Sequence, residues 1–262
     1  MNADTLLLDV KDQIAYITLN RPHAANGVNL PLSKELMYAA NKCDEDPGIR
    51  AVVLTGSGSA FCAGGDLRHF AGTGDQLSMS LKEMTVYVHA AVSRLTRMNK
   101  PLITAVNGVA AGAGMSLAIA GDLIIAAESE SFVAAYTAAG LSPDGGMTWL
   151  LPRMIGLSKA REIILTNRRL TAKEAVAWGL INKCVPDDDM SQEVESAVKY
   201  FAKGPSGSFG KIKQLLTSCF TETLETQMEM EARGISDMAR TRDGKEGVEA
   251  FIQKRKPDFC GC

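Results

Sequence analysis

The stretch that decides the fold is NGVAAGAG, residues Asn107–Gly114, between the apolar run Pro101–Val106 and the helical run Met115–Ala120. Glycine and alanine let a ligand or another segment approach the main chain closely. The first N–H groups of a helix lack intrahelical partners and carry a partial positive charge. The pattern of strand, small-residue turn and helix start therefore predicts a place where a developing negative charge can bind.

A second loop of small residues, AFCAGGDLR at Ala60–Arg68, follows the buried strand predicted at Ala51–Thr55. If one N–H group from each loop pointed at the same oxygen, the pair would form an oxyanion hole. The same glycines are equally consistent with nothing more than tight packing of strands against helices. A dinucleotide-binding loop fits poorly, because Leu117 stands where its third glycine belongs.

A third segment, GLSPDGGMTW at Gly140–Trp149, places Asp144 between a proline and two glycines, just before an apolar helical stretch. Such an aspartate most often accepts hydrogen bonds from the N–H groups at a helix start. It could instead be a general base that moves a proton during catalysis. The residues alone leave both interpretations open.

The first half of the chain alternates strands with helices. β-branched and apolar runs predict strands, and apolar residues at helical spacing predict helices. This alternation is typical of an α/β fold with mostly parallel strands. The remaining segments expected from these patterns are strands at Ile14–Leu19 and Leu123–Ala127, and helices at Leu30–Asp44 and Leu81–Met98.

The second half of the chain is predicted to be helical. Thr171 and Glu174 fit a capping box that opens a helix over Ala172–Trp178, and Gly179 is its expected end. The helices expected after it cover Asp188–Lys203, Gly210–Thr217, Thr221–Ala239 and Lys245–Lys254. A helical tail after an α/β core often forms a subunit interface or covers a site.

Composition excludes several classes of protein. The 262 residues carry a net charge of −2, and no basic stripe favours nucleic acid. No apolar run is long enough to span a membrane. The six cysteines lack zinc-binding spacing and are expected to be reduced thiols. We therefore expect a cytoplasmic protein without a metal site.

Five blocks together, in this order and spacing, resemble the crotonase (enoyl-CoA hydratase/isomerase) superfamily. The resemblance implies an α/β fold, a crotonase-like spiral of ββα units in a core over residues 1–200. It also implies a C-terminal helical region over 201–262 that covers the active site and mediates trimers, often paired into hexamers. The substrate would be an acyl-CoA thioester, with no other cofactor and no metal. The blocks are Tyr16–Pro22, Ala51–Leu67, Asn107–Asp122, Gly140–Arg153 and Leu170–Val185.

The resemblance also implies roles for individual residues. The main-chain N–H groups of Gly65 and Ala113 would bind the thioester oxygen, and Ala113 replaces a glycine that is common there. Arg68 resembles a contact to a CoA phosphate, although a solvated surface charge is an equally good interpretation. The other residues expected to bind the substrate are Ala24 and Ala25 in the turn after the first strand, together with Ala63, Asp66, Leu67, His89, Ser116 and Tyr136.

Two departures from the hydratases of this superfamily shape the predicted activity. The positions that resemble the two hydratase glutamates carry Ser116 and Tyr136, so hydration by that route is not expected. Asp144 falls where several enoyl-CoA isomerases, including those of phenylacetate breakdown, carry a single acid. The resemblance therefore implies an isomerase that shifts a double bond in an unsaturated or ring-containing acyl-CoA, with Asp144 as its acid–base group.

Two alternatives stay open. The 4-chlorobenzoyl-CoA dehalogenases are also similar, with an aspartate at the Asp144 position and a histidine at the His89 position. In such an enzyme, or in a thioester hydrolase, Asp144 would be a nucleophile. His89 is more often a structural helix residue than a catalytic one. The loss of both glutamates also allows a non-catalytic protein that only binds acyl-CoA.

Overall fold

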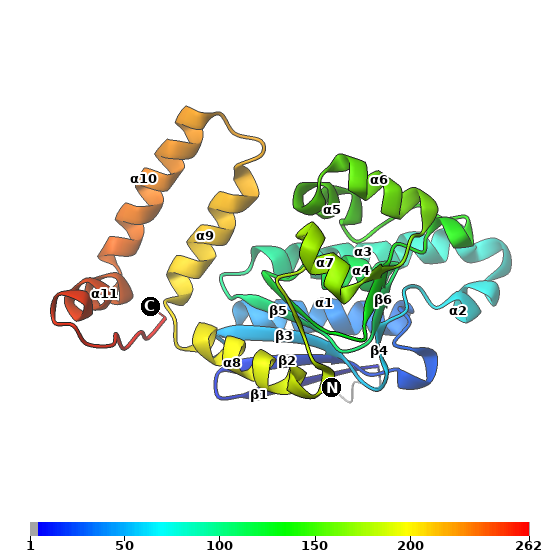
Figure 1. Ribbon diagram of the computed structural model, residues 1–262, viewed down its shortest axis with the longest axis horizontal. Helices are drawn as coiled ribbons and strands as arrows, with labels where there is room; N and C mark the ends of the chain where they lie inside the picture. Colours follow the sequence, from blue (N-terminus) through cyan, green and yellow to red (C-terminus); the bar gives the residue numbers. More distant parts are fainter. Residues whose placement is uncertain (1–4, 262) are drawn as a thin grey trace.

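The computed structural model describes residues 5–261, which form two β-sheets surrounded by helices (Figure 1). The larger sheet has six strands in the order β1-β2-β3-β5-β7-β10, all parallel except the β1–β2 hairpin. The predicted α/β fold with mostly parallel strands is confirmed. These strands are β1 (Leu6–Lys11), β2 (Ile14–Leu19), β3 (Ala51–Gly56), β5 (Leu102–Val106), β7 (Leu123–Ala127) and β10 (Lys183–Val185).

The smaller sheet has four short strands in the order β4-β6-β8-β9, and only the β8–β9 pair is antiparallel. Its first two strands lie inside the two small-residue loops, where the sequence analysis expected turns without a strand. The prediction was incomplete there because a three-residue strand gives almost no periodic signal. The four strands are β4 (Ala60–Cys62), β6 (Val109–Ala111), β8 (Ser131–Val133) and β9 (Leu170–Thr171).

Helices cover both faces of the larger sheet. On one face, α1 and α3 pack together in the main hydrophobic core, which also includes the smaller sheet. On the other face, α8 contributes Met190, Val194 and Val198 to a second core with Val53 and Ile125 of the sheet. The helices up to α8 are α1 (Leu30–Glu45), α2 (Leu67–Ala71), α3 (Leu77–Arg97), α4 (Ala113–Ala118), α5 (Met147–Ile155), α6 (Leu157–Thr166), α7 (Ala172–Trp178) and α8 (Met190–Ala202).

The last three helices extend away from the sheets (Figure 1). They are α9 (Ser206–Ser218), α10 (Leu224–Arg240) and α11 (Arg242–Ile252). The buried Arg50 guanidinium anchors this region, because it donates hydrogen bonds to the carbonyl oxygens of Gly204 and Phe259. No helix within residues 5–261 is long and apolar enough to cross a membrane.

Several helix ends and the cysteines lie where the sequence predicts them, with two exceptions. The capping box at Thr171 and Glu174 is present, and Gly179 ends α7 in a left-handed conformation. The helix predicted from Leu81 begins four residues earlier, at Leu77. Four cysteines are free thiols as expected, but Cys260 forms a disulfide, so the expectation of reduced thiols is wrong there. Cys262 lies outside the described residues.

The two small-residue loops pack main chain against main chain. A Cβ atom on Gly114 would overlap the carbonyl oxygen of Cys62 in β4, and one on Gly108 would overlap the backbone of Ala60. Gly64, at φ +100°, lies against Ala111 of β6. Any side chain at these positions would separate β4 from β6.

We expect Gly114→Ala to destabilise the protein by about 1–3 kcal/mol, because the added methyl group must displace the β4 backbone. Gly207→Ala in α9 is the matched control, since its Cβ would meet only the Met238 sulfur at 3.5 Å. Urea unfolding of both variants at one protein concentration measures the difference. Equal midpoints for Gly114→Ala and the unmodified protein would contradict this account of the packing.

Candidate active site

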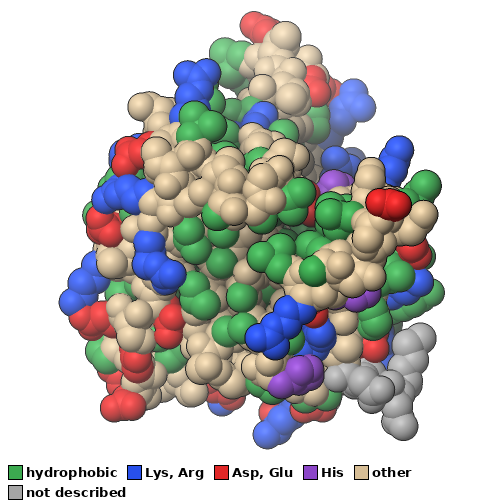
Figure 2. All heavy atoms as spheres, turned by 90° about the vertical axis from the view of Figure 1, so that its right-hand side faces the viewer, with side chains coloured by type: hydrophobic (Ala, Val, Ile, Leu, Met, Phe, Trp, Pro, Cys, Tyr) green, Lys and Arg blue, Asp and Glu red, His purple; other side chains and the backbone are tan. Residues whose placement is uncertain are grey.

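A cavity of about 250 Å³ lies where α2, α3 and the two small-residue loops meet. Its wall is mainly apolar, and Asp144 is its only carboxylate among the described residues. Figure 2 views the molecule from the side on which α2 lies in Figure 1, and shows hydrophobic side chains gathered on this face with lysine and arginine side chains around them. All the lining residues fall between Val28 and Asp144, so residues 201–261 of the same chain contribute none.

The main chain of both loops reaches the cavity wall at Gly65 and Ala113. Within residues 5–261, neither N–H group donates a hydrogen bond to another protein group. Ala113 is the first residue of α4, where the helix leaves its N–H without an intrahelical acceptor. The two predicted donors are therefore unpaired N–H groups of residues that line one cavity, and an oxyanion hole needs unpaired donors of this kind.

The first loop is held by Asn26, which the sequence analysis missed. The fully buried Asn26 side chain donates to the carbonyl oxygens of Ala60 and Ser57 and accepts a hydrogen bond from the Arg21 N–H. Its own backbone is left-handed, with φ +56°. An asparagine after Pro22-His23-Ala24-Ala25 is a recognisable turn residue, but nothing in the sequence indicates which carbonyls it binds.

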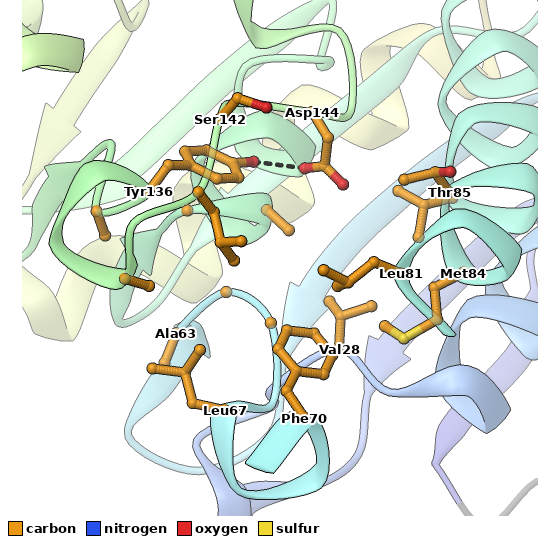
Figure 3. A pocket seen from close by; sticks show the side chains of 18 residues that line it. Val28, Ala63, Leu67, Phe70, Leu81, Met84, Thr85, Tyr136, Ser142 and Asp144 are labelled. Atoms are coloured by element: carbon orange, nitrogen blue, oxygen red, sulfur yellow. Dashed lines mark hydrogen bonds between the residues drawn. The ribbon is translucent and has the colours of Figure 1, made fainter. Parts of the chain in front are cut away.

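Asp144 does not cap the following helix. The N-cap of α5 is Gly146, and no side chain accepts a hydrogen bond there. Instead, Oδ1 of Asp144 accepts a hydrogen bond of 2.6 Å from the Tyr136 hydroxyl, and the other carboxylate oxygen is directed toward the cavity (Figure 3). The helix-cap interpretation of Asp144 is therefore wrong.

Tyr136 and Ser116 form a polar support around Asp144. The Ser116 hydroxyl lies 3.0 Å from the Tyr136 hydroxyl oxygen and donates to the Asp144 carbonyl oxygen at 2.9 Å. Burial, followed by the negative charge of Asp144, raises the pKa of the Tyr136 hydroxyl above its ordinary value. Tyr136 therefore stays neutral and remains a hydrogen-bond donor to the carboxylate.

The other predicted substrate-binding residues divide into two groups. Ala63 and Leu67 lie on the cavity wall with Tyr136. Those that do not line it are Ala24, Ala25, Asp66, Arg68, His89 and Ser116. Arg68 is exposed, and the turn formed by Ala24 and Ala25 is joined to the first loop by the hydrogen bond from the Ala63 N–H to the Ala25 carbonyl oxygen. A contact between these residues and CoA stays a prediction.

Asp66 and His89 have protein partners. Asp66 caps α2 and forms an ion pair of 2.8 Å with Arg21. Burial acts to raise the pKa of the Asp66 carboxyl, but Arg21 and backbone N–H groups outweigh it and hold the pKa below its ordinary value. The exposed His89 accepts a hydrogen bond from the Gly145 N–H at its Nε2 atom.

Most of the cavity wall consists of residues that the sequence did not single out. One helix face of α3 supplies four of these residues at the spacing i, i+3, i+4 and i+7, within a helix that was predicted without a role in the site. Two of the four, Met84 and Val88, are buried. The cavity-lining side chains that it did not single out as site residues are Val28, Phe70, Leu81, Met84, Thr85, Val88, Ala135, Ala139, Leu141 and Ser142.

Known proteins resemble this chain over its full length. The family model for enoyl-CoA hydratase/isomerase matches residues 9–261. A 1,2-epoxyphenylacetyl-CoA isomerase from Escherichia coli is 40% identical over 98% of both chains, and a probable enoyl-CoA hydratase from Rhodobacter capsulatus is 38% identical over 100% of both. The crystal structure of an enoyl-CoA hydratase from Bacillus anthracis superimposes with a TM-score of 0.92 at 32% identity, covering 98% of this chain and 100% of the other.

These matches and the two mixed sheets define an acyl-CoA enzyme with the crotonase fold. The chain belongs to the enoyl-CoA hydratase/isomerase family, the crotonase superfamily, which acts on acyl-CoA thioesters. Among residues 5–261, no group of three or more histidine, cysteine, aspartate or glutamate side chains is placed to hold a metal ion.

We expect Tyr136→Phe to lower the free energy of unfolding by about 1–3 kcal/mol near neutral pH, because it removes a hydrogen bond to a charged group. The raised pKa of Tyr136 stabilises the fold below about pH 10, the ordinary tyrosine value, and this contribution is lost as the pH rises further. The difference in free energy of unfolding between the unmodified protein and Tyr136→Phe should therefore become smaller above about pH 10. Chemical unfolding across this range measures it.

Tyr38→Phe is the control, because Tyr38 is exposed and has no hydroxyl hydrogen bond within residues 5–261. Its stability difference from the unmodified protein should be small near neutral pH. A difference for Tyr136→Phe that stays constant through the alkaline range would contradict the burial of a neutral Tyr136 hydroxyl.

Proposed function

We propose that this enzyme is an enoyl-CoA isomerase that shifts a double bond in an unsaturated or ring-containing acyl-CoA. The observation that carries the proposal is Asp144, the single carboxylate among the described residues of a cavity that Gly65 and Ala113, with N–H groups unpaired within residues 5–261, also line. A double-bond shift needs one group that can both remove and return a proton. It also needs donors that stabilise the enolate formed between the two transfers.

In the proposed reaction, the Asp144 carboxylate removes a proton from C2 of a 3-enoyl thioester. The electrons of the broken C–H bond form a C1–C2 double bond, and the negative charge moves to the thioester oxygen. The N–H groups of Gly65 and Ala113 bind this oxygen. Protonated Asp144 then returns the proton to C4, and the double bond comes to lie between C2 and C3.

Ser116 and Tyr136 support an isomerase over a hydratase. Both side chains form hydrogen bonds with the Asp144 residue, and neither is a carboxylate that could activate a water molecule. The apolar wall around Asp144 also favours an acyl chain over water beside the reacting carbons. The similarity to the 1,2-epoxyphenylacetyl-CoA isomerase of E. coli adds support for isomerase chemistry.

We also propose that the chain self-associates through its C-terminal helical region, as a homotrimer or a pair of trimers. Large apolar side chains are exposed on these helices, including Ile235 at 74%, Phe251 at 86% and Ile252 at 74%. An apolar surface of this kind is typical of a protein interface.

Asp144→Asn should lower kcat/KM for a 3-enoyl-CoA by about 10²–10⁴-fold, because the amide cannot accept the proton. Absorbance of the conjugated 2-enoyl product measures the reaction. The control is Asp188→Asn, which alters an exposed acid before α8 and should leave the rate unchanged. Full activity of a folded Asp144→Asn variant, or efficient hydration of crotonyl-CoA by the unmodified enzyme, would refute the proposal.

Ala113→Pro tests the second oxyanion donor, since proline lacks the N–H group yet is tolerated at the first position of a helix. We expect kcat to fall by about 10²–10³-fold, the usual effect of losing one such donor. Ala113→Gly keeps the N–H and should retain far more activity. Similar rates for the two variants, with circular dichroism showing intact helices, would exclude this N–H from the reaction.

A further inference from the structure

The peptide group that follows Asp144 is held at both of its polar ends. Its carbonyl oxygen, on Asp144, accepts a hydrogen bond of 2.9 Å from the Ser116 hydroxyl. Its N–H group, on Gly145, donates a hydrogen bond of 3.2 Å to Nε2 of His89. The two partners come from different helices, Ser116 from α4 and His89 from α3. The peptide plane therefore has a fixed orientation between these helices.

The Met147 N–H also donates to the Asp144 carbonyl oxygen, at 3.2 Å, but His89 is the acceptor of the Gly145 N–H. Gly145 and Gly146 follow Asp144 with φ values of +60° and +82°. Both are glycines, and neither has a side chain that could pack against a neighbour. A Cβ on Gly145 would lie 2.8 Å from the Cβ of Ser116, which prevents a larger residue from taking over the restraint. Glycine has the widest choice of backbone conformations, so the direction of the preceding residue depends on hydrogen bonds.

His89 is well placed to supply one of these bonds without meeting the substrate. It follows Val88, whose side chain lines the cavity, but His89 itself is exposed and is not part of the cavity wall. An imidazole nitrogen accepts a hydrogen bond only when it carries no proton. The bond to the Gly145 N–H therefore requires an uncharged His89 with its proton on Nδ1.

We propose that His89 is a positioning residue, which fixes the Asp144–Gly145 peptide and thereby directs the Asp144 carboxylate toward the carbons from which it moves the proton. Tyr136 holds one oxygen of the carboxylate, and His89 holds the backbone that carries it. This inference rests on the proposed isomerase function. It gives His89 no part in proton transfer, unlike the role of a histidine that activates water.

Two variants separate positioning from the alternatives. His89→Leu removes the acceptor at similar size, whereas His89→Gln keeps an oxygen that can accept from the Gly145 N–H. We expect His89→Leu to lower kcat for a 3-enoyl-CoA about tenfold with little change in KM, the size of effect of one hydrogen bond. His89→Gln should recover most of the rate. Lys82→Leu, an exposed position two turns earlier on α3, is the control.

Hydrogen exchange supplies a readout that is independent of catalysis. Exchange of the Gly145 amide can be followed by mass spectrometry in a peptide that covers residues 141–150. This amide should exchange faster in His89→Leu than in the unmodified protein, and His89→Gln should restore a rate close to that of the unmodified protein. An unchanged kcat or an unchanged exchange rate in His89→Leu would overturn the proposal. Loss of activity in both His89 variants would also overturn it, because a positioning role needs only a hydrogen-bond acceptor, which glutamine supplies.

The failure of this inference is distinguishable from failure of the proposed function. If Asp144→Asn abolishes isomerisation while His89→Leu has no effect, only the positioning role is excluded. If Asp144→Asn retains the activity, the isomerase mechanism itself is wrong, whatever the His89 variants do.

Discussion

The close approach of β4 and β6 is the constraint on which the site depends. The two strands are hydrogen-bonded neighbours, and the loops that continue from them bring Gly65 and Ala113 to the wall of the same cavity. Gly108 and Gly114 permit this approach because their α-carbons lie against the β4 backbone with no room for a side chain. A fixed pair of donors costs little reorganisation when charge develops on a bound oxygen.

Much of the fold could be predicted from the sequence, because the larger elements have strong periodic patterns. The strand at Ile14–Leu19 and the capping box at Thr171 were located to the residue. β1 was missed because its hairpin turn uses Asp12 and Gln13, both with positive φ, and Gln is not a residue that marks such turns. The short strands β4 and β6 were missed because long-range pairing, and not local pattern, makes them strands.

The site could be predicted only in part, for a physical reason. Ser116, Tyr136 and Asp144 are recognisable in the sequence only one at a time, as replacements for two glutamates and as a loop acid. Their side chains and main chain form one hydrogen-bonded group. This group depends on the tertiary structure, because the three residues come from separate segments. Asp144 is an example of a side chain whose position the local sequence does not predict. Its local pattern favours a helix cap, and only the position of the Tyr136 hydroxyl places the carboxylate elsewhere.

The proposed oxyanion donors belong to the main chain. Substitutions can hardly remove a main-chain N–H group, whereas they can readily replace the side chains of the site. Almost any residue at position 113 would keep its N–H group, as the alanine found there illustrates. The acids and hydroxyls around it are side chains, each open to replacement by a single substitution. In the proposed site, new chemistry can therefore arise by moving or exchanging one acid, while the main-chain groups that would bind the thioester oxygen are inherited unchanged.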